Sequence, residues 1–68
     1  MRYQVNLFDA KHPSQPCRRM ERKPSKQSAI DSALGWVSEA GKSAVIVRGG
    51  NVVMRYWRDD EGLQYISY

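Results

Sequence analysis

Apolar residues recur at helical spacing along one stretch of this chain, from Ser25 to Gly41. At about 100° per residue, the apolar side chains of this stretch fall on one continuous arc and the polar side chains on the opposite arc. The sequence therefore predicts one amphipathic helix whose apolar face is wide enough to cover a sheet. That face carries Ala29, Ile30, Ala33, Leu34, Trp36, Val37 and Ala40.

The ends of this helix have recognisable signals. Pro24 discourages an earlier helical residue, and the hydroxyl of Ser25 can accept a main-chain N–H of the first turn, so Ser25 is the expected N-cap. Gly41 is expected to end the helix as a left-handed C′ residue, followed by Lys42, a cation suited to the negative end of the helix dipole. Leu34 is expected in the core, where truncation to alanine would cost several kcal/mol.

Outside this stretch, the apolar pattern predicts strands. Tyr3, Val5 and Leu7 alternate with polar residues, as in a half-buried strand, and Ser43–Arg48 is β-branched and almost continuously apolar, as in a central strand. Gly49-Gly50-Asn51 supplies residues that tolerate positive φ in a tight hairpin. The predicted strands are Arg2–Phe8, Ser43–Arg48, Asn51–Arg58 and Leu63–Tyr68.

The segment 9–24 is a basic, proline-containing loop or loose hairpin. Pro13 and Pro16 remove main-chain donors and predict a loop over Lys11–Pro16. Cys17–Lys23 has few apolar residues, so it is interpreted as an edge strand that pairs with the first strand. The alternative is a mobile basic arm that becomes ordered on a partner.

These elements predict an α+β fold with the order β-β-α-β-β-β. A single antiparallel sheet of four to five strands would carry one helix across one face. A chain of 68 residues supports one domain, residues 1–68, with a core so small that a homodimer is also open. We expect Val52, Met54 and Tyr56 to face the helix and Val53, Arg55 and Trp57 to face away from it, although a one-residue slip would invert this assignment.

Charge is concentrated in one part of the chain. The net charge is +4, and the segment from Asp9 to Lys26 contains six bases and two acids, so it accounts for the whole excess. Such a segment attracts nucleic acid or an acidic protein surface.

Reactive residues are few. His12 and Cys17 are the single members of their types, and nothing in their spacing provides the base and orienting group that a nucleophile needs. Structural zinc sites require about four ligands, and Asp59-Asp60-Glu61 lacks the spacing of a calcium loop. The sequence therefore predicts no catalytic residue, no metal and no cofactor. One cysteine and the absence of a signal or membrane segment predict a cytoplasmic protein.

Binding is the function that these residues favour. Arginine, lysine and aromatic side chains can neutralise phosphates and stack on bases, and tryptophan, tyrosine and arginine also anchor protein interfaces. Ordinary solubilising surface is the alternative interpretation. The candidate binding residues are Arg18, Arg19, Arg22, Lys23, Lys26, Arg48, Arg55, Trp57 and Arg58.

The order of elements, with a short basic hairpin, one helix and a three-stranded meander, resembles several small phage-encoded inhibitors. Some anti-CRISPR proteins of type I systems are among them. The resemblance implies a non-enzymatic protein that acts in the host cytoplasm and blocks a CRISPR-Cas-like defence complex, or another complex that handles nucleic acid, by covering one of its surfaces. Direct binding of DNA or RNA through the same residues is the alternative.

Overall fold

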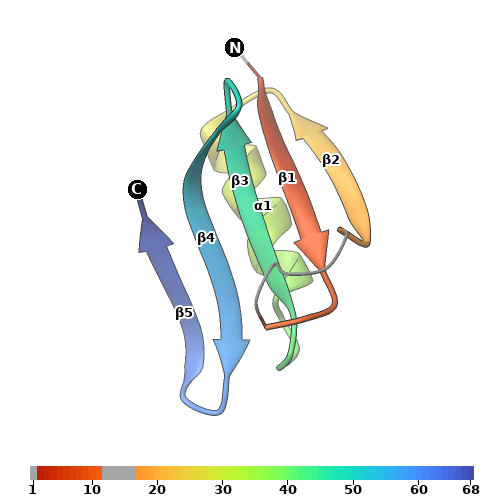
Figure 1. Ribbon diagram of the computed structural model, residues 1–68, viewed down its shortest axis with the longest axis vertical. Coiled ribbons are helices and arrows are strands. Elements are labelled where there is room, and N and C mark those ends of the chain that lie inside the picture. Colours follow the sequence, from red (N-terminus) through yellow and green to blue (C-terminus); the bar gives the residue numbers. More distant parts are fainter. Residues whose placement is uncertain (1, 12–16) are drawn as a thin grey trace.

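Five strands form one open antiparallel sheet, and one helix lies across part of one face (Figure 1). The computed structural model describes residues 2–11 and 17–68. The strands lie in the order β2-β1-β3-β4-β5, which confirms the predicted α+β fold and its sequence of elements. The elements are β1 (Tyr3–Phe8), β2 (Arg19–Lys23), α1 (Lys26–Trp36), β3 (Ser43–Arg48), β4 (Asn51–Asp59) and β5 (Gly62–Ser67).

The weak strand predicted within Cys17–Lys23 is present. β2 pairs with β1 in a register that places Tyr3 opposite Lys23 and Leu7 opposite Arg19, and it forms one edge of the sheet. Arg19–Lys23 is therefore part of the sheet, rather than an arm that waits for a partner. The loop predicted over Lys11–Pro16 lies almost entirely outside the described residues.

The core lies between α1 and the central strands. Strand register places alternate residues of β1, β3 and β4 on the face that α1 covers, which we call the helix side. Alanines on α1 let the helix approach the sheet closely, and each large side chain that is fully buried contributes roughly 1.5–3 kcal/mol. The buried residues of this core are Val5, Leu7, Ala29, Ala33, Val37, Ala44, Ile46, Met54 and Tyr56.

A β-bulge changes the predicted faces of two valines. Met54 and Tyr56 face the helix as expected, but the register shifts between Ile46 and Val47, so that Val47 pairs with Val52 and Val53 is skipped. Val53 therefore packs against the core, and Val52 is 45% exposed. The prediction was wrong for this pair because a bulge inserts a residue that strict alternation does not anticipate.

The helix begins as predicted and ends earlier. Ser25 is the N-cap, and its hydroxyl accepts the N–H of Ser28 while the Ser28 hydroxyl accepts the N–H of Ser25. The last helical residue is Trp36, so the predicted end at Gly41 is wrong. Gly41 does have a positive φ of 86°, but within the α1–β3 connection, where its N–H donates to the carbonyl of Arg58.

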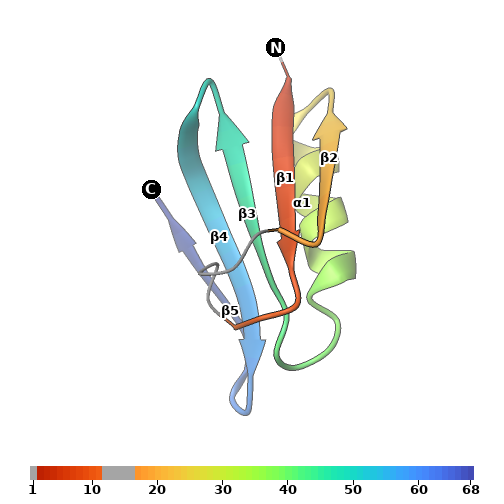
Figure 2. The same cartoon turned by 45° about the vertical axis from the view of Figure 1, so that its right-hand side comes forward.

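The prediction that Leu34 is a core residue is also wrong. Ala33 points at the sheet, and Ser32 lies on the flank of α1 that bonds to β2, so Leu34 falls on the opposite flank, toward β4. The helix packs against β1, β3 and β2, and Figure 2 shows β4 and β5 extending away from it. Leu34 remains 37% exposed because little of the molecule covers that flank.

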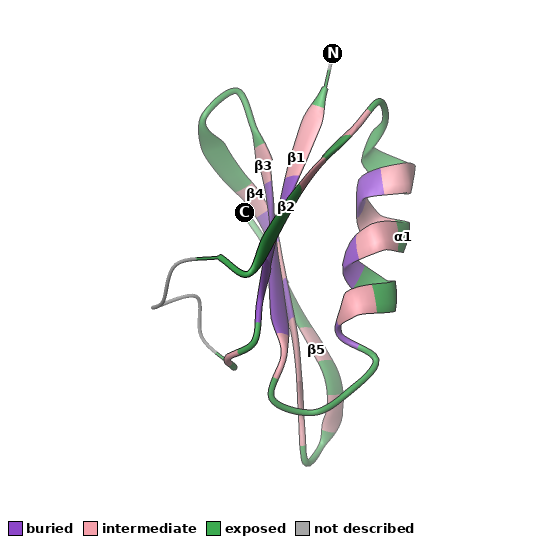
Figure 3. Cartoon of the chain, turned by 90° about the vertical axis from the view of Figure 1, so that its right-hand side faces the viewer, coloured by how far each residue is buried: buried purple, intermediate pink, exposed green. Residues whose placement is uncertain are grey.

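Residues 9–11, which follow β1, lie on the face opposite the helix, which we call the open face (Figure 3). The hydroxyl of Ser43 donates to the carbonyl of Ala10 at 2.6 Å, and Nη2 of Arg55 donates to the carbonyl of Lys11 at 3.3 Å. Phe8 lies on the open face and is nevertheless buried. In the described part of the chain, no helix is long and apolar enough to cross a membrane.

Candidate functional site

Four of the predicted binding residues lie on or beside β2, at one edge of the sheet. We call Arg18, Arg19, Arg22 and Lys23 the basic edge. Alternation divides them, because Arg19 and Lys23 lie on the helix side and Arg22 lies on the open face. Arg19 and Lys23 both pair with Glu21, at 3.0 and 3.5 Å, and Arg18 pairs with Asp9 at 3.6 Å. Two carboxylates thus offset part of the charge of the basic edge.

Glu21 also ties β2 to α1. Its carboxylate accepts a hydrogen bond from the Ser32 hydroxyl, which is the largest cause of a lowered pKa for Glu21. Desolvation opposes this shift, whereas the charges of Arg19 and Lys23 add to it. Glu21 therefore holds Arg19 and Lys23 of the basic edge in position and links their strand to the helix.

Lys26 and Arg48 lie near the end of the sheet where the chain passes from β2 into α1. Lys26 is the first residue of the helix and is exposed. Arg48 is the last residue of β3, and its guanidinium lies 5.5 Å from the centre of the Tyr3 ring. Since Tyr3 is opposite Lys23, this end of the molecule gathers cationic side chains from β2, α1 and β3.

Arg55 and Trp57 lie together on the open face. They are two residues apart on β4, and the guanidinium of Arg55 lies 4.6 Å from the centre of the Trp57 ring. Both are half-buried, and Arg55 also bonds to the carbonyl of Lys11. This pair therefore presents a partly covered aromatic and cationic surface.

Arg58 does not join them. It points to the helix side, where its Nε donates to the carbonyl of Val37 at 2.6 Å. Arg55, Trp57 and Arg58 are all predicted binding residues, but they do not form one surface because consecutive strand residues face opposite sides. Arg58 holds the end of the helix, so we assign it a structural role.

One exposed surface was missed by the sequence reasoning. On the helix side of β5, Leu63 and Tyr65 are 39% and 63% exposed, and Leu34 on α1 is 37% exposed. Tyr65 stacks against Tyr56 with ring centres 5.8 Å apart. We call Leu34, Leu63 and Tyr65 the uncovered strip. The alternation of apolar and polar residues in Leu63–Tyr68 indicated which side chains share a face of this strand. The early end of the helix, which leaves this strip exposed, was not predicted.

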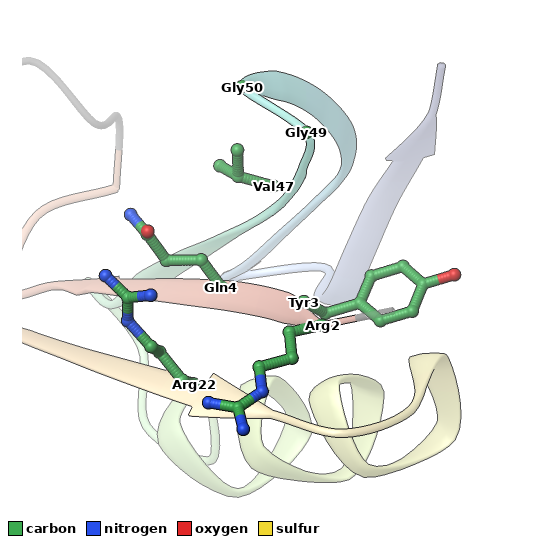
Figure 4. A pocket seen from close by; sticks show the side chains of 7 residues that line it. All are labelled: Arg2, Tyr3, Gln4, Arg22, Val47, Gly49 and Gly50. Carbon is green, nitrogen blue, oxygen red and sulfur yellow. The ribbon is translucent and has the colours of Figure 1, made fainter.

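A second missed feature is a hollow of about 180 Å³ on the open face, beside the β3–β4 turn (Figure 4). It lies at the same end as Lys26 and Arg48. Of its lining residues, the candidate list contained Arg22 alone. The residues that line it are Arg2, Tyr3, Gln4, Arg22, Val47, Gly49 and Gly50.

Two residues were considered for chemistry, and the structure describes one of them. Cys17 is an exposed free thiol, and His12 lies outside the described residues. Within residues 2–11 and 17–68, no group of three His, Cys, Asp or Glu side chains could hold a metal ion.

Comparisons with known proteins give no relative for this chain. No protein-family model matches the sequence, and no curated protein or solved structure matches it either. Function is therefore argued from the surfaces described above.

Proposed function

We propose that this chain is a non-catalytic binding protein that acts by covering a surface of another protein. The observation that carries the proposal is the uncovered strip, because the helix packs mainly against β1, β2 and β3 and leaves Leu63 and Tyr65 of β5 exposed. Contiguous exposed apolar side chains often mark interaction sites, and tyrosine is enriched among residues that dominate interface energies.

The charge of the molecule suggests the kind of partner. Cationic side chains gather at one end of the sheet and along the basic edge, so an acidic partner surface would be attracted and oriented. On a complex that handles nucleic acid, such an acidic surface would lie outside the basic groove that holds the nucleic acid. The order of elements resembles that of small phage-encoded inhibitors, and on that resemblance the proposal is an inhibitor of a complex that handles nucleic acid, including a CRISPR-Cas-like defence complex, in the host cytoplasm.

Direct nucleic-acid binding is the second candidate. It is favoured by the hollow, where Arg2 and Arg22 lie near each other on the open face. It is weakened by the ion pairs of the basic edge, since Arg18, Arg19 and Lys23 each already lie near a carboxylate. We therefore favour protein binding over direct nucleic-acid binding.

The test of the leading candidate begins with immobilised protein and an extract of the host cell. Proteins retained by the wild type are identified, purified and measured for affinity to the wild type and to Tyr65→Ser. We expect Tyr65→Ser to weaken binding at least tenfold, and Trp57→Ala to report whether the open face also contributes. The control is Gln27→Ala, an exposed substitution on the outer side of α1. Equal affinity of the wild type and Tyr65→Ser would remove the uncovered strip as the binding site.

The second candidate is tested by titration with duplex and single-stranded DNA and RNA at two salt concentrations. Binding through several phosphates would weaken steeply with salt, with a log–log slope near −0.9 per phosphate contact for duplex DNA. Binding that depends on Arg22 but not on Tyr65 would favour direct nucleic-acid recognition over protein binding. No binding at low salt would remove this candidate.

A further inference from the structure

The hollow beside the β3–β4 turn is built from three adjacent strands. Gln4 lies opposite Arg22 of β2 and also opposite Val47 of β3, so these three side chains stand in a row on the open face. Arg2 precedes Gln4 by two residues and shares its face. The row is therefore fixed by sheet register rather than by loop conformation.

Two of these side chains, Arg2 and Arg22, are cations that form no ion pair with a described carboxylate. Arg2 and Arg22 are both exposed, and within residues 2–11 and 17–68 no ion pair joins either one to a carboxylate. Arg18, Arg19 and Lys23 differ, because each has such a partner. In Figure 4 the side chain of Arg22 extends toward β1 and that of Arg2 extends toward β2. Both side chains line the hollow, and two positive charges around one hollow favour an anion within it.

The other lining groups keep the hollow open and polar. Gly49 and Gly50 form the tight turn with φ of 59° and 82°, and a Cβ at either position would meet open space. Nε2 of Gln4 donates to Asn6 at 2.9 Å, which orients the amide and leaves its second N–H available. The hollow is smaller than the usual 300–1,000 Å³ of drug-sized ligand sites, which fits a single oxyanion group.

We propose that this hollow binds a phosphate group through Arg2 and Arg22, with the Gln4 amide as an additional donor. A guanidinium presents paired N–H groups that match two phosphate oxygens, and two guanidiniums can share the three or four oxygens of one phosphate. The glycine turn lines the hollow with main chain alone. The mechanism differs from that of a phosphate loop before a helix, since α1 lies on the other face of the sheet. This inference does not depend on the leading proposal of protein binding, and it names the chemical group that the second candidate, nucleic acid, would present.

The phosphate could be free or part of a nucleic-acid backbone, and the test separates these sources. The protein labelled with ¹⁵N is titrated in one series with sodium phosphate and in another with a short single-stranded oligonucleotide, with sodium chloride holding the ionic strength constant. We expect saturable shifts confined to the amides of Gln4, Arg22, Val47, Gly49 and Gly50. At least tenfold tighter binding per phosphate in the oligonucleotide series would identify a backbone phosphate, and the reverse a free phosphate.

Matched variants decide whether the hollow is responsible. Arg22→Gln and Arg2→Gln should each weaken binding at least tenfold, and Arg22→Lys should weaken it less, because it keeps the charge but loses the paired N–H groups. The control is Arg19→Gln, on the same strand but the other face, which should change affinity less than twofold. Circular dichroism confirms that each variant is folded. Equal losses in Arg22→Gln and Arg19→Gln, or shifts spread over all basic residues, would overturn the proposal, as would the absence of saturable shifts in both series.

Discussion

Nε of Arg58 on β4 donates a hydrogen bond to the main-chain carbonyl of Val37, the residue that caps the end of α1. The main chain of Arg58 reinforces this link, since its N–H donates to Lys42 and its carbonyl accepts from Gly41. One residue of β4 therefore fixes both the end of the helix and the connection to β3. This relationship removes Arg58 from the binding surface and makes it a determinant of stability.

Replacing Arg58 with methionine should lower the free energy of unfolding by about 1.5–3 kcal/mol, the range for a hydrogen bond from a charged donor to a partly buried acceptor. Urea denaturation followed by circular dichroism measures this loss. The matched control is Arg19→Met, whose side chain is 66% exposed and forms a surface ion pair with Glu21, so its cost should stay below about 1 kcal/mol. Similar losses in both variants would contradict the structural role of Arg58.

Truncation of Leu34 and truncation of Ile46 to alanine should lower the free energy of unfolding by very different amounts. Ile46 is completely buried between β1 and β4, so Ile46→Ala should cost roughly 2–5 kcal/mol, enough to unfold a domain of this size. Leu34→Ala should cost less than about 1 kcal/mol, because Leu34 is 37% exposed. Thermal denaturation of the two variants makes the comparison. A loss of the folded state in Leu34→Ala would show that its flank of the helix is covered, for example by self-association.

Glu21 should make stability depend on acid pH. Its pKa lies below the usual 4.5 chiefly because Ser32 donates to the carboxylate. Its contribution is therefore complete above pH 4.5 and is lost as the pH falls through the folded-state pKa. Denaturation at pH 7 and pH 3 should show that Glu21→Gln costs stability at pH 7 and much less at pH 3.

Ser32→Ala should reproduce this pattern in part, because it removes the main cause of the shift. Asp60→Asn provides the control, since Asp60 is an exposed carboxylate in the β4–β5 turn. If Asp60→Asn showed the same pH-dependent difference as Glu21→Gln, net charge rather than the Ser32–Glu21 contact would be responsible.

Tyr56 should make stability depend on alkaline pH. Burial raises the pKa of its phenol above 10.0, and the nearby Tyr65 adds to the shift. The unfolded chain thus ionises first, so the contribution of Tyr56 is complete below pH 10 and is lost as the pH rises through the folded-state value. Tyr56→Phe should flatten the decline in stability above pH 10, as measured by denaturation at pH 8 and pH 11. The exposed Tyr68→Phe should leave that decline unchanged.

Local patterns were sufficient to predict most of the elements. The strand pattern of Arg2–Phe8, the β-branched run Ser43–Arg48 and the cap at Ser25 are properties of neighbouring residues, so they predicted the order β-β-α-β-β-β and the pairing of the weak strand. The same patterns could not locate the bulge that exchanges Val52 and Val53, because a bulge depends on the partner strand. They also extended the helix past Trp36, since the apolar periodicity continues beyond the last helical residue.

By itself, the sequence determined the secondary-structure elements, the central position of β3 and the concentration of positive charge. These follow from alternation, turn residues and composition, which are properties of the chain alone. Only the tertiary structure decided which cations remain accessible. It placed Arg58 against Val37 and Glu21 between Arg19 and Lys23, while it left Arg2 and Arg22 together beside the glycine turn. The physical reason is that charge accessibility depends on contacts between strands that are distant in sequence, and sheet register sets those contacts.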